Sequence, residues 1–216
     1  MKYKLIVFDW DGTLMDSAAA IVHAIQASCR DLGLRVPEEA RARHVIGLGL
    51  ADALHHAAPD LLPERYPEMA ERYRHHYLSR DHNINLFEGA AELVKDLLAS
   101  GHMLAIATGK SRVGLDRVLA SSGLGPLFHG SRCADECHSK PHPQMLEELM
   151  SEFGVEAAET LMIGDTSHDL LMAANAGVDG LAVTYGAHSH AHLLDHGPVA
   201  CLHSVPELSA WLKRNG

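Results

Sequence analysis

Residues 4–14 read KLIVFDWDGTL, and this stretch decides the fold. Its first part, Leu5 to Phe8, is apolar at every position, which is typical of a β-strand buried on both faces of a sheet. The run ends in an acidic cluster that includes Gly12, so a sharp polar turn follows the strand directly. Strands with both faces buried occur mainly in parallel sheets that helices cover on both sides. The stretch therefore predicts such a sheet, with a polar turn at the carboxyl end of one strand.

Similar short apolar runs recur in the second half of the chain, and segments with helical spacing lie between them. Several of these segments stop at a glycine, the residue that most easily forms a left-handed C-cap. Strands that alternate with helices predict βαβ units, and hence an α/β fold with a doubly wound, Rossmann-like parallel sheet. The further predicted strands are Met103–Ala107, Thr160–Ile163, Gly180–Thr184 and Val199–Leu202, and the predicted helices are Ser111–Ser122, Pro143–Phe153, Ser167–Ala176 and Val205–Lys213.

One long stretch breaks this alternation. From Ser17 to Asn83 the sequence contains no convincing strand, and its apolar residues follow helical spacing over residues 18–32, 50–57 and 64–78. Prolines and glycines separate these segments, as expected for short helices joined by turns. We therefore predict a helical cap domain of residues 17–83, inserted after the first strand into a sheet domain of residues 1–16 and 84–216.

Composition excludes several classes of function. The 216 residues carry 18 Lys and Arg against 28 Asp and Glu, a formal net charge of −10, whereas nucleic-acid binding needs clustered positive charge. No apolar run approaches the ~20 residues of a membrane span, and the N-terminal run meets Asp9 too early for a signal peptide. We expect a cytoplasmic protein that binds neither nucleic acid nor membrane, with its four cysteines as reduced thiols.

Seventeen histidines are unusual for a chain of this length, and four of them lie close together near the C-terminus. Imidazoles one helical turn apart can bind Zn²⁺, Ni²⁺ or Cu²⁺. The alternative, which we favour, is a solvated helix that is rich in histidine. The four residues are His188, His190, His192 and His196.

Polar side chains gather where the predicted strands end. Ligands of open α/β sheets bind outside the carboxyl ends of the strands, so we expect these side chains to meet at one edge. Carboxylates, a hydroxyl, a lysine and free backbone amides can together hold a hard divalent cation and a phosphate. The residues are Asp9 and Asp11 after the first strand, Thr108, Gly109 and Lys110 after the second, Lys140 before a helix, and Asp165 and Asp169 after the strand at Thr160–Ile163.

Together these motifs resemble those of the haloacid-dehalogenase superfamily of phosphohydrolases. DWDGTL at residues 9–14 resembles the first motif of that family, and TGK at residues 108–110 resembles the second. KPHP at residues 140–143 resembles the third, and GDTSHD at residues 164–169 resembles the fourth. The resemblance spans nearly the whole chain, and the helical insert is similar to that family's first type of cap. It implies a Mg²⁺-dependent phosphatase.

The resemblance implies different roles for the first two aspartates. Asp9 would be the nucleophile that forms an aspartyl-phosphate, which divides one hard displacement into two easier ones. Asp11 would protonate the leaving group and then deprotonate the attacking water. Asp9 must therefore be ionised, whereas Asp11 must carry a proton in the first half-reaction, so we expect the two carboxyl groups to lie in different environments.

The resemblance also implies which residues hold the metal and the phosphate. Mg²⁺ would be bound by the Asp9 carboxylate, the Asp11 backbone carbonyl and Asp165, and Asp169 would orient this group and pair with Lys140. The phosphoryl oxygens would be bound by Thr108, the Gly109 amide and Lys140.

Substrate specificity is expected to lie in the insert. The loop Val45–Leu50, which contains two glycines, is expected to face the site, and nearby cationic residues are candidate partners for a substrate carboxylate. These candidates are Arg41, Arg43 and His44. The overall pattern is most similar to phosphoglycolate phosphatases, so a small phosphorylated metabolite is the expected partner.

Other readings stay open at this point. A pyrophosphatase, a sugar-phosphate phosphatase or a β-phosphoglucomutase-like enzyme would use a similar scaffold. From a different class, a phospho-accepting signalling module would also bring Asp, Thr and Lys to strand ends with Mg²⁺, although it would be shorter and lack the insert. The sequence leaves open whether the protein is a monomer or a homodimer.

Overall fold

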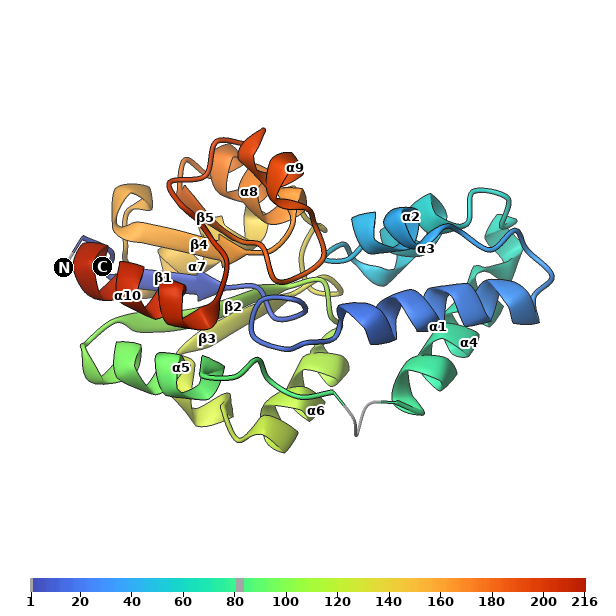
Figure 1. Cartoon of the computed structure of the whole chain (residues 1–216), viewed down its shortest axis with the longest axis horizontal. Helices are drawn as coiled ribbons and strands as arrows, with labels where there is room; N and C mark the ends of the chain where they lie inside the picture. Colours follow the sequence, from blue (N-terminus) through green and yellow to red (C-terminus); the bar gives the residue numbers. More distant parts are fainter. Residues whose placement is uncertain (1, 81–83) are drawn as a thin grey trace.

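The computed structural model describes residues 2–80 and 84–216. Its centre is a six-stranded sheet in the order β3-β2-β1-β4-β5-β6, with every neighbouring pair parallel (Figure 1). The first predicted strand is the central β1, which pairs with β2 and β4. The predicted α/β, doubly wound fold is confirmed. The strands are β1 Leu5–Phe8, β2 Met103–Thr108, β3 Gly130–Cys133, β4 Thr160–Gly164, β5 Asp179–Val183 and β6 Cys201–Leu202.

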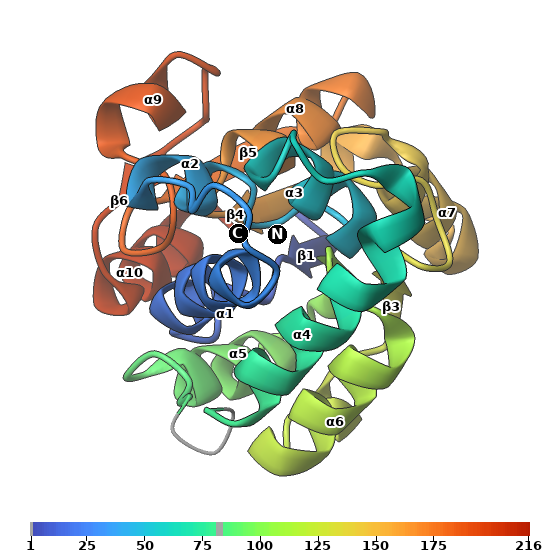
Figure 2. The ribbon, with the colours of Figure 1, turned by 90° about the vertical axis from the view of Figure 1, so that its right-hand side faces the viewer.

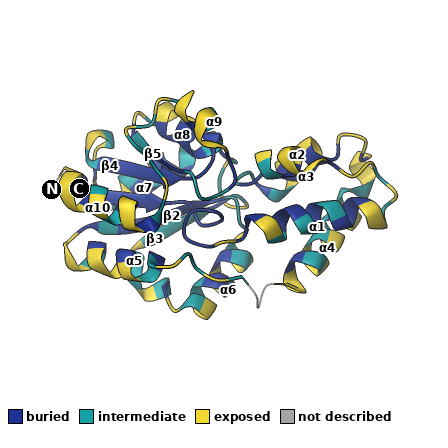
Figure 3. Ribbon diagram, in the orientation of Figure 1, coloured by how far each residue is buried: buried dark blue, intermediate teal, exposed yellow. Residues whose placement is uncertain are grey.

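Helices cover both faces of the sheet. Leu5 and Val7 of β1 pack against α7 and α8 on one face, and Ile6 and Phe8 pack against α5, α6 and α10 on the other. All four side chains are fully buried, as Figure 3 shows for the central strands generally. Among the described residues, no helix is both long enough and apolar enough to span a membrane. The helices are α5 Ala90–Ala99, α6 Arg112–Ser122, α7 Gln144–Phe153, α8 Ser167–Asn175, α9 His190–Leu194 and α10 Val205–Asn215.

The chain leaves the sheet after β1 and forms four helices before it returns. This helical insert has its own apolar cluster, which contains Ile25 of the first helix, Leu54 of the third and Met69 of the fourth. In Figure 2 the insert lies between the viewer and the sheet. The division of the chain into two domains at residues 17 and 83 stays a prediction. The insert helices are α1 Ala18–Asp31, α2 Glu39–His44, α3 Leu50–Ala57 and α4 Tyr66–Leu78.

The structure also contains elements that the sequence did not indicate. Strand β3 has the sequence GSRC and lies at the edge of the sheet, where three of its four residues are only half-buried. An edge strand needs no apolar run, so its sequence carries little signal. Helices α2 and α5 were also not predicted, and the expected strand Val199–Leu202 is shortened to β6 at the opposite edge.

Candidate active site

Three buried carboxylates meet at the carboxyl edge of the sheet. Asp9 directly follows β1, Asp165 directly follows β4, and Asp169 lies in the first turn of α8. One carboxylate oxygen from each residue lies within 4.8 Å of the others. All three side chains are almost completely buried. The expected meeting of these three residues is therefore found in the structure.

Lys140 lies between two of these carboxylates. Its ammonium Nζ is 2.6 Å from Asp9 Oδ1 and 2.6 Å from Asp169 Oδ1. Burial alone would lower the pKa of Lys140, but the carboxylates of Asp169 and Asp9 outweigh burial and raise that pKa above its ordinary value. Lys140 is therefore held as a cation, and within the described ranges two of its three N–H groups have acceptors, so the third can donate to a ligand.

Hydrogen bonds fix the other two acids. Asp165 accepts from the Thr13 hydroxyl at 3.0 Å and from the backbone N–H of Ala187 at 2.7 Å. Asp169 Oδ2 accepts from the hydroxyl of Thr166 at 2.7 Å and from the backbone N–H of the same residue at 3.1 Å, because Thr166 and Asp169 form the capping box of α8. The first turn of this helix therefore sets the direction of Asp169.

The Asp9 carboxylate is the exception, because one of its oxygens has no such support. Oδ2 is buried and has no hydrogen-bond partner among residues 2–80 and 84–216. Burial raises the pKa of Asp9 to about 7, although the Lys140 ammonium acts in the opposite direction. Burial, together with the Asp9 carboxylate, also raises the pKa of Asp165. Buried acids with raised pKa values and an oxygen without a hydrogen-bond partner are typical of a cation-binding site.

The donor set fits a hard divalent ion. Asp169 already directs its oxygens at Lys140 and Thr166, which leaves Asp9 Oδ2 and the remaining lone pairs of Asp165 for a ligand. Carboxylate oxygens are the ligands that Mg²⁺ prefers. A Cβ atom on Gly186 would overlap the Asp165 side chain, so the backbone here must come close to the acid. The sequence analysis gave neither Gly186 nor the Ala187 amide a role.

Asp11 lies apart from this trio and has different neighbours. Its Oδ1 accepts from the Ser17 hydroxyl at 2.6 Å and lies 3.0 Å from the Lys110 ammonium. Burial opposes the charge on Lys110, but the Asp11 carboxylate and Tyr77 raise the pKa of Lys110 above its ordinary value. Lys110 Nζ is also 3.1 Å from the Tyr77 hydroxyl on α4 of the insert.

The environments of Asp9 and Asp11 therefore differ, and the roles expected of the two carboxyl groups stay predictions. Burial raises the pKa of Asp9, whereas Asp11 lies beside the Lys110 ammonium. The sequence analysis treated Lys110 only as part of the second motif and did not predict its ion pair with Asp11. Ser17 and Tyr77 were missed as well, because only the packing of the insert brings them near.

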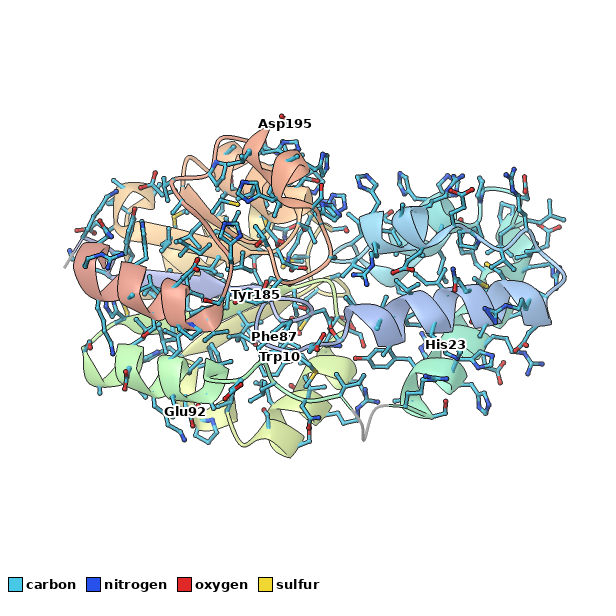
Figure 4. All side chains as sticks on the ribbon, viewed as in Figure 1. Trp10, His23, Phe87, Glu92, Tyr185 and Asp195 are labelled. Atoms are coloured by element: carbon cyan, nitrogen blue, oxygen red, sulfur yellow. The ribbon has the colours of Figure 1, made fainter. Side chains whose placement is uncertain are left out.

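The turn after β1 is supported from behind by aromatic side chains. The Tyr185 hydroxyl donates to the Thr13 carbonyl at 3.1 Å, and the Tyr185 ring packs edge-on against Phe87 with ring centroids 4.6 Å apart. Trp10 is fully buried and packs against Phe128. Figure 4 labels Trp10, Phe87 and Tyr185 where the insert meets the sheet. These contacts hold the acidic turn in place.

The second motif and the insert loop lie against each other. The Thr108 hydroxyl oxygen accepts from the Lys110 N–H at 3.2 Å and is buried, so its own hydrogen can be donated elsewhere. A Cβ atom on Gly109 would overlap the backbone carbonyls of Gly47 and Leu48. Gly49 of the same loop donates its N–H to Ser139 Oγ at 2.9 Å. The loop Val45–Leu50 thus faces the site, as its two glycines predicted.

The three cationic candidates of the insert lie elsewhere. Arg41 donates to the His56 carbonyl, and Arg43 pairs with Glu39 on the surface of α2. His44 packs against the histidines of the sheet part. None of the three lines the cavity that opens beside Asp11. The prediction that they reach a substrate carboxylate there is therefore not supported by their positions.

The four histidines near the C-terminus do not form one cluster, because they contact different partners in the fold. His190 stacks on His203, whereas His188 and His192 meet His44, so that three ring nitrogens lie within 4.8 Å of one another. The rings of His44 and His188 are nearly parallel, at 7° and 5.0 Å between centroids, so one ion cannot lie in both ring planes. His188 also accepts from the Ser167 N–H at 3.0 Å. This arrangement is a packing contact between α2 and the sheet part, and metal binding there stays a hypothesis.

Comparison with known proteins agrees with this geometry. A family model described as haloacid dehalogenase-like hydrolase matches residues 6–183. A probable phosphatase, IndB, from Dickeya dadantii is 37% identical over 86% of this chain and 83% of its own length. The pyrophosphatase PpaX of Halalkalibacterium halodurans is 32% identical over 96% of both chains. A crystal structure from Haemophilus somnus, described as a predicted phosphoglycolate phosphatase, superposes with a TM-score of 0.87 at 26% identity, covering 100% of this chain and 99% of the other. The chain belongs to the haloacid dehalogenase-like hydrolase family.

Proposed function

We propose that the chain is a Mg²⁺-dependent phosphatase that hydrolyses a small phosphomonoester through an aspartyl-phosphate on Asp9. The observation that carries this proposal is the state of the Asp9 carboxylate. Lys140 holds Oδ1 at 2.6 Å, while Oδ2 is buried with no partner in the described ranges. An unpaired buried oxygen is costly, so its presence beside a buried cation supports a nucleophile built to meet a ligand.

The residues that would hold the metal follow from the donor set. Asp9 and Asp165 would bind Mg²⁺ together with the Asp11 backbone carbonyl that the resemblance implies, and Asp169 would orient the group through Lys140. Bound there, Mg²⁺ would keep Asp9 ionised and neutralise negative charge on the phosphoryl oxygens.

In the first half-reaction one oxygen of the Asp9 carboxylate attacks phosphorus, and the bond from phosphorus to the ester oxygen breaks. The departing oxygen takes a proton from Asp11. The free N–H of Lys140, the Thr108 hydroxyl and the Gly109 amide are donors for the phosphoryl oxygens, on which charge shifts in the transition state. The Lys140 and Thr108 side chains are buried, which makes them effective donors because water competes poorly there.

In the second half-reaction water attacks the aspartyl-phosphate, and Asp11 accepts a proton from that water. Asp11 has given up its proton in the first half-reaction, so it can accept one here while its Oδ1 lies 3.0 Å from the Lys110 ammonium. Inorganic phosphate leaves and the Asp9 carboxylate is restored. Lys110 therefore acts as a positioning residue, because it holds Asp11 rather than the reacting phosphorus.

The test is phosphate release with Mg²⁺ and with EDTA, for the natural protein, Asp9→Asn and the matched control Asp16→Asn. The substrates are 2-phosphoglycolate, pyrophosphate, glucose 1-phosphate, a nucleoside monophosphate and an aryl phosphate. We expect Mg²⁺-dependent turnover that falls by at least about 10³-fold in Asp9→Asn. Asp16 is exposed in the same turn, so its variant should keep the natural rate.

Acid quenching during turnover should trap a phosphoryl group on Asp9 that hydroxylamine removes. Turnover that persists in Asp9→Asn would contradict the nucleophile. Stable labelling of Asp9 without phosphate release would instead favour the phospho-accepting signalling module.

Phosphoglycolate is the specific substrate that the sequence resemblance implies. Pyrophosphate is a second candidate, because one relative is named a pyrophosphatase. A glycolate group carries a carboxylate, which calls for a cation near Asp11. Lys110 is already paired with Asp11, Arg41, Arg43 and His44 lie outside the cavity, and the other cations that line it are Arg74 and Arg117. The residues that line the cavity are therefore the best guide to the chemistry of the leaving group.

A further inference from the structure

A large cavity lies between the insert and the carboxyl edge of the sheet. Its volume is about 860 Å³, and Asp11, Gly109 and Lys110 form the part nearest the proposed phosphate site. A leaving group bonded to phosphorus at Asp9 and protonated by Asp11 would extend into this space. Cavities of 300–1,000 Å³ accept ligands of drug size, which exceed a glycolate group by far.

The lining that the insert contributes to this cavity is largely apolar. It includes Leu48 and Leu50 of the loop and the ring of Tyr73 on α4. Figures 1 and 2 both show α1 and α4 side by side, and Ile25 and Leu54 are almost completely buried. Ile25 and Leu54 belong to the apolar core of the insert, whereas Leu48, Leu50 and Tyr73 pack on that core and are half-buried, so they present alkyl and aromatic surface to the cavity.

Charges around the cavity balance. Three acids, Asp11, Asp52 and Asp135, are matched by three cations, Lys110, Arg74 and Arg117. Lys110 is held between Asp11 and the Tyr77 hydroxyl, at 3.0 and 3.1 Å. A lining without net charge exerts little long-range attraction on a leaving group that carries a carboxylate or a second phosphate.

Tyr73 adds one polar group to the apolar wall. Its ring stacks on Tyr77 at 5.9 Å between centroids, and its hydroxyl makes no hydrogen bond within the described part of the chain. Burial raises the pKa of Tyr73, so the hydroxyl stays neutral and keeps its hydrogen. It can donate that hydrogen to a ligand, while the ring offers a stacking surface.

We infer that the leaving group of the substrate is bulky, uncharged and largely apolar, in the size range of an aromatic alcohol, and that it lies against Leu48, Leu50 and Tyr73. This inference rests on the proposed phosphatase function and specifies its substrate class. An apolar wall discriminates by size and hydrophobic contact, and one methylene group changes kcat/KM by roughly 10–200-fold.

The test compares phosphomonoesters whose alcohols are of similar chemical reactivity, so that differences report binding. The substrates are ethyl, hexyl and benzyl phosphate, with 2-phosphoglycolate and pyrophosphate as charged competitors. We expect kcat/KM for benzyl phosphate to exceed those for ethyl phosphate and 2-phosphoglycolate by at least about 100-fold, in the presence of Mg²⁺.

A matched pair of variants ties this preference to the cavity. Val113 lines the cavity and is 79% exposed, so Val113→Asp should fold normally and bring an unpaired charge to the wall. We expect it to lower the ratio of kcat/KM for benzyl to ethyl phosphate about tenfold. Val199→Asp, at a position 44% exposed and outside the cavity, should leave this ratio unchanged.

Each outcome decides between the two proposals. A lead for 2-phosphoglycolate or pyrophosphate, or an equal effect of the two aspartate variants, overturns the apolar leaving group and leaves the phosphatase proposal standing. Absence of Mg²⁺-dependent phosphate release from every substrate overturns the phosphatase proposal and the inference with it.

Discussion

Two ion pairs of equal length show how burial changes the role of a charge. Lys110–Asp11 and Lys213–Asp96 both have a nitrogen–oxygen distance of 3.0 Å. The side chains of the first pair are 10% and 11% exposed, and those of the second are 64% and 56% exposed. Losing one partner of a buried pair leaves the other charge in a poor solvent, whereas an exposed partner is simply hydrated.

We predict that Lys110→Met lowers the free energy of unfolding by about 3–5 kcal/mol, because Asp11 is left buried without its cation. Lys213→Met should cost at most about 1 kcal/mol. The double variant Asp11→Leu/Lys110→Met should recover most of the loss, because both charges are gone. Urea unfolding measures all three. A loss in Lys110→Met that the double variant does not recover would show that packing, not charge, is responsible.

At the residue scale, the sequence was informative where the strand ends determine position. Asp9 and Asp165 could be placed together because β1 and β4 are neighbours and their carboxyl ends share one edge. Ser17 and Tyr77 could not be placed beside Asp11 and Lys110. Their positions depend on how α1 and α4 pack, and no local pattern in the sequence encodes that packing.

At the scale of elements, buried strands were predicted and polar ones were missed. Strands β1, β2 and β4 are central and apolar, so their burial is visible in the sequence. Strand β3 is a polar edge strand, and its pairing with β2 is determined by the fold rather than by its own residues. The insert loop Val45–Leu50 was predicted to face the site because its glycines permit a close approach, and Gly109 supplies the opposing surface.

Gly109→Ala tests that close approach. The added methyl group would meet the backbone carbonyls of Gly47 and Leu48, so the loop must move away from the phosphate site. We predict that kcat/KM falls about 100-fold, as for other displacements of about 1 Å near reacting groups. Faster amide hydrogen exchange over residues 45–50 should accompany this loss.

Gly125→Ala is the matched control, since a Cβ atom there meets only Leu119 atoms at ordinary contact distance, 3.6 Å or more. Its activity and its exchange rates should match those of the natural protein. If Gly109→Ala retained full activity, the loop would not need to lie against the second motif.

The contact between α2, α8 and the loop after β5 predicts sensitivity to acid. Burial, with a smaller effect of His168, lowers the pKa of His188 to about 4. Its Nδ1 accepts from the Ser167 N–H, and a proton on that nitrogen would break the bond. The groups that face His188 are the rings of His44, His168 and His192 and the backbone of Asp165.

Between pH 6.5 and 4 the unfolded chain binds a proton at His188 that the folded chain does not, so stability falls as pH falls through this range. From pH 7 to 5 we predict that His188→Asn, whose amide oxygen can accept the same N–H, loses about 2 kcal/mol less free energy of unfolding than the natural protein. His190→Asn changes an exposed histidine and should show the natural loss. Urea unfolding in EDTA at both pH values measures the difference, and equal losses in both variants would contradict the role of His188.

At the scale of the whole molecule, the site combines two units with different tasks. The sheet edge brings together Asp9, Asp165 and Asp169, while the insert supplies the apolar wall and the Tyr77 contact to Lys110. The charge chemistry thus follows from the topology of the sheet, which the sequence pattern predicts well. The shape of the leaving-group cavity follows from packing within the insert, which requires the structure.

The three carboxylates of the proposed metal site lower the stability of the fold when no cation is bound. Asp9, Asp165 and Asp169 place three carboxylates within 4.8 Å in a buried space, and Lys140 compensates only two of them directly. Without a divalent cation, burial and mutual repulsion oppose ionisation of Asp165 and raise its pKa. The folded state is therefore less stable than it would be with a neutral group at this position.

We predict that Asp165→Asn is more stable than the natural protein in EDTA and inactive in Mg²⁺. The asparagine oxygen can accept the Ala187 N–H and its amide can donate to Thr13, so both hydrogen bonds survive while the charge is lost. Each 1 kcal/mol gained should raise Tm by roughly 2–4 °C. Saturating Mg²⁺, at about 100 times Kd, should stabilise the natural protein by about 2.7 kcal/mol and leave the variant unchanged. Asp195→Asn, on the outer surface in Figure 4, should respond to Mg²⁺ like the natural protein. A lower Tm for Asp165→Asn in EDTA would show that the ionised carboxylate is worth more to the fold through its hydrogen bonds than it costs through repulsion.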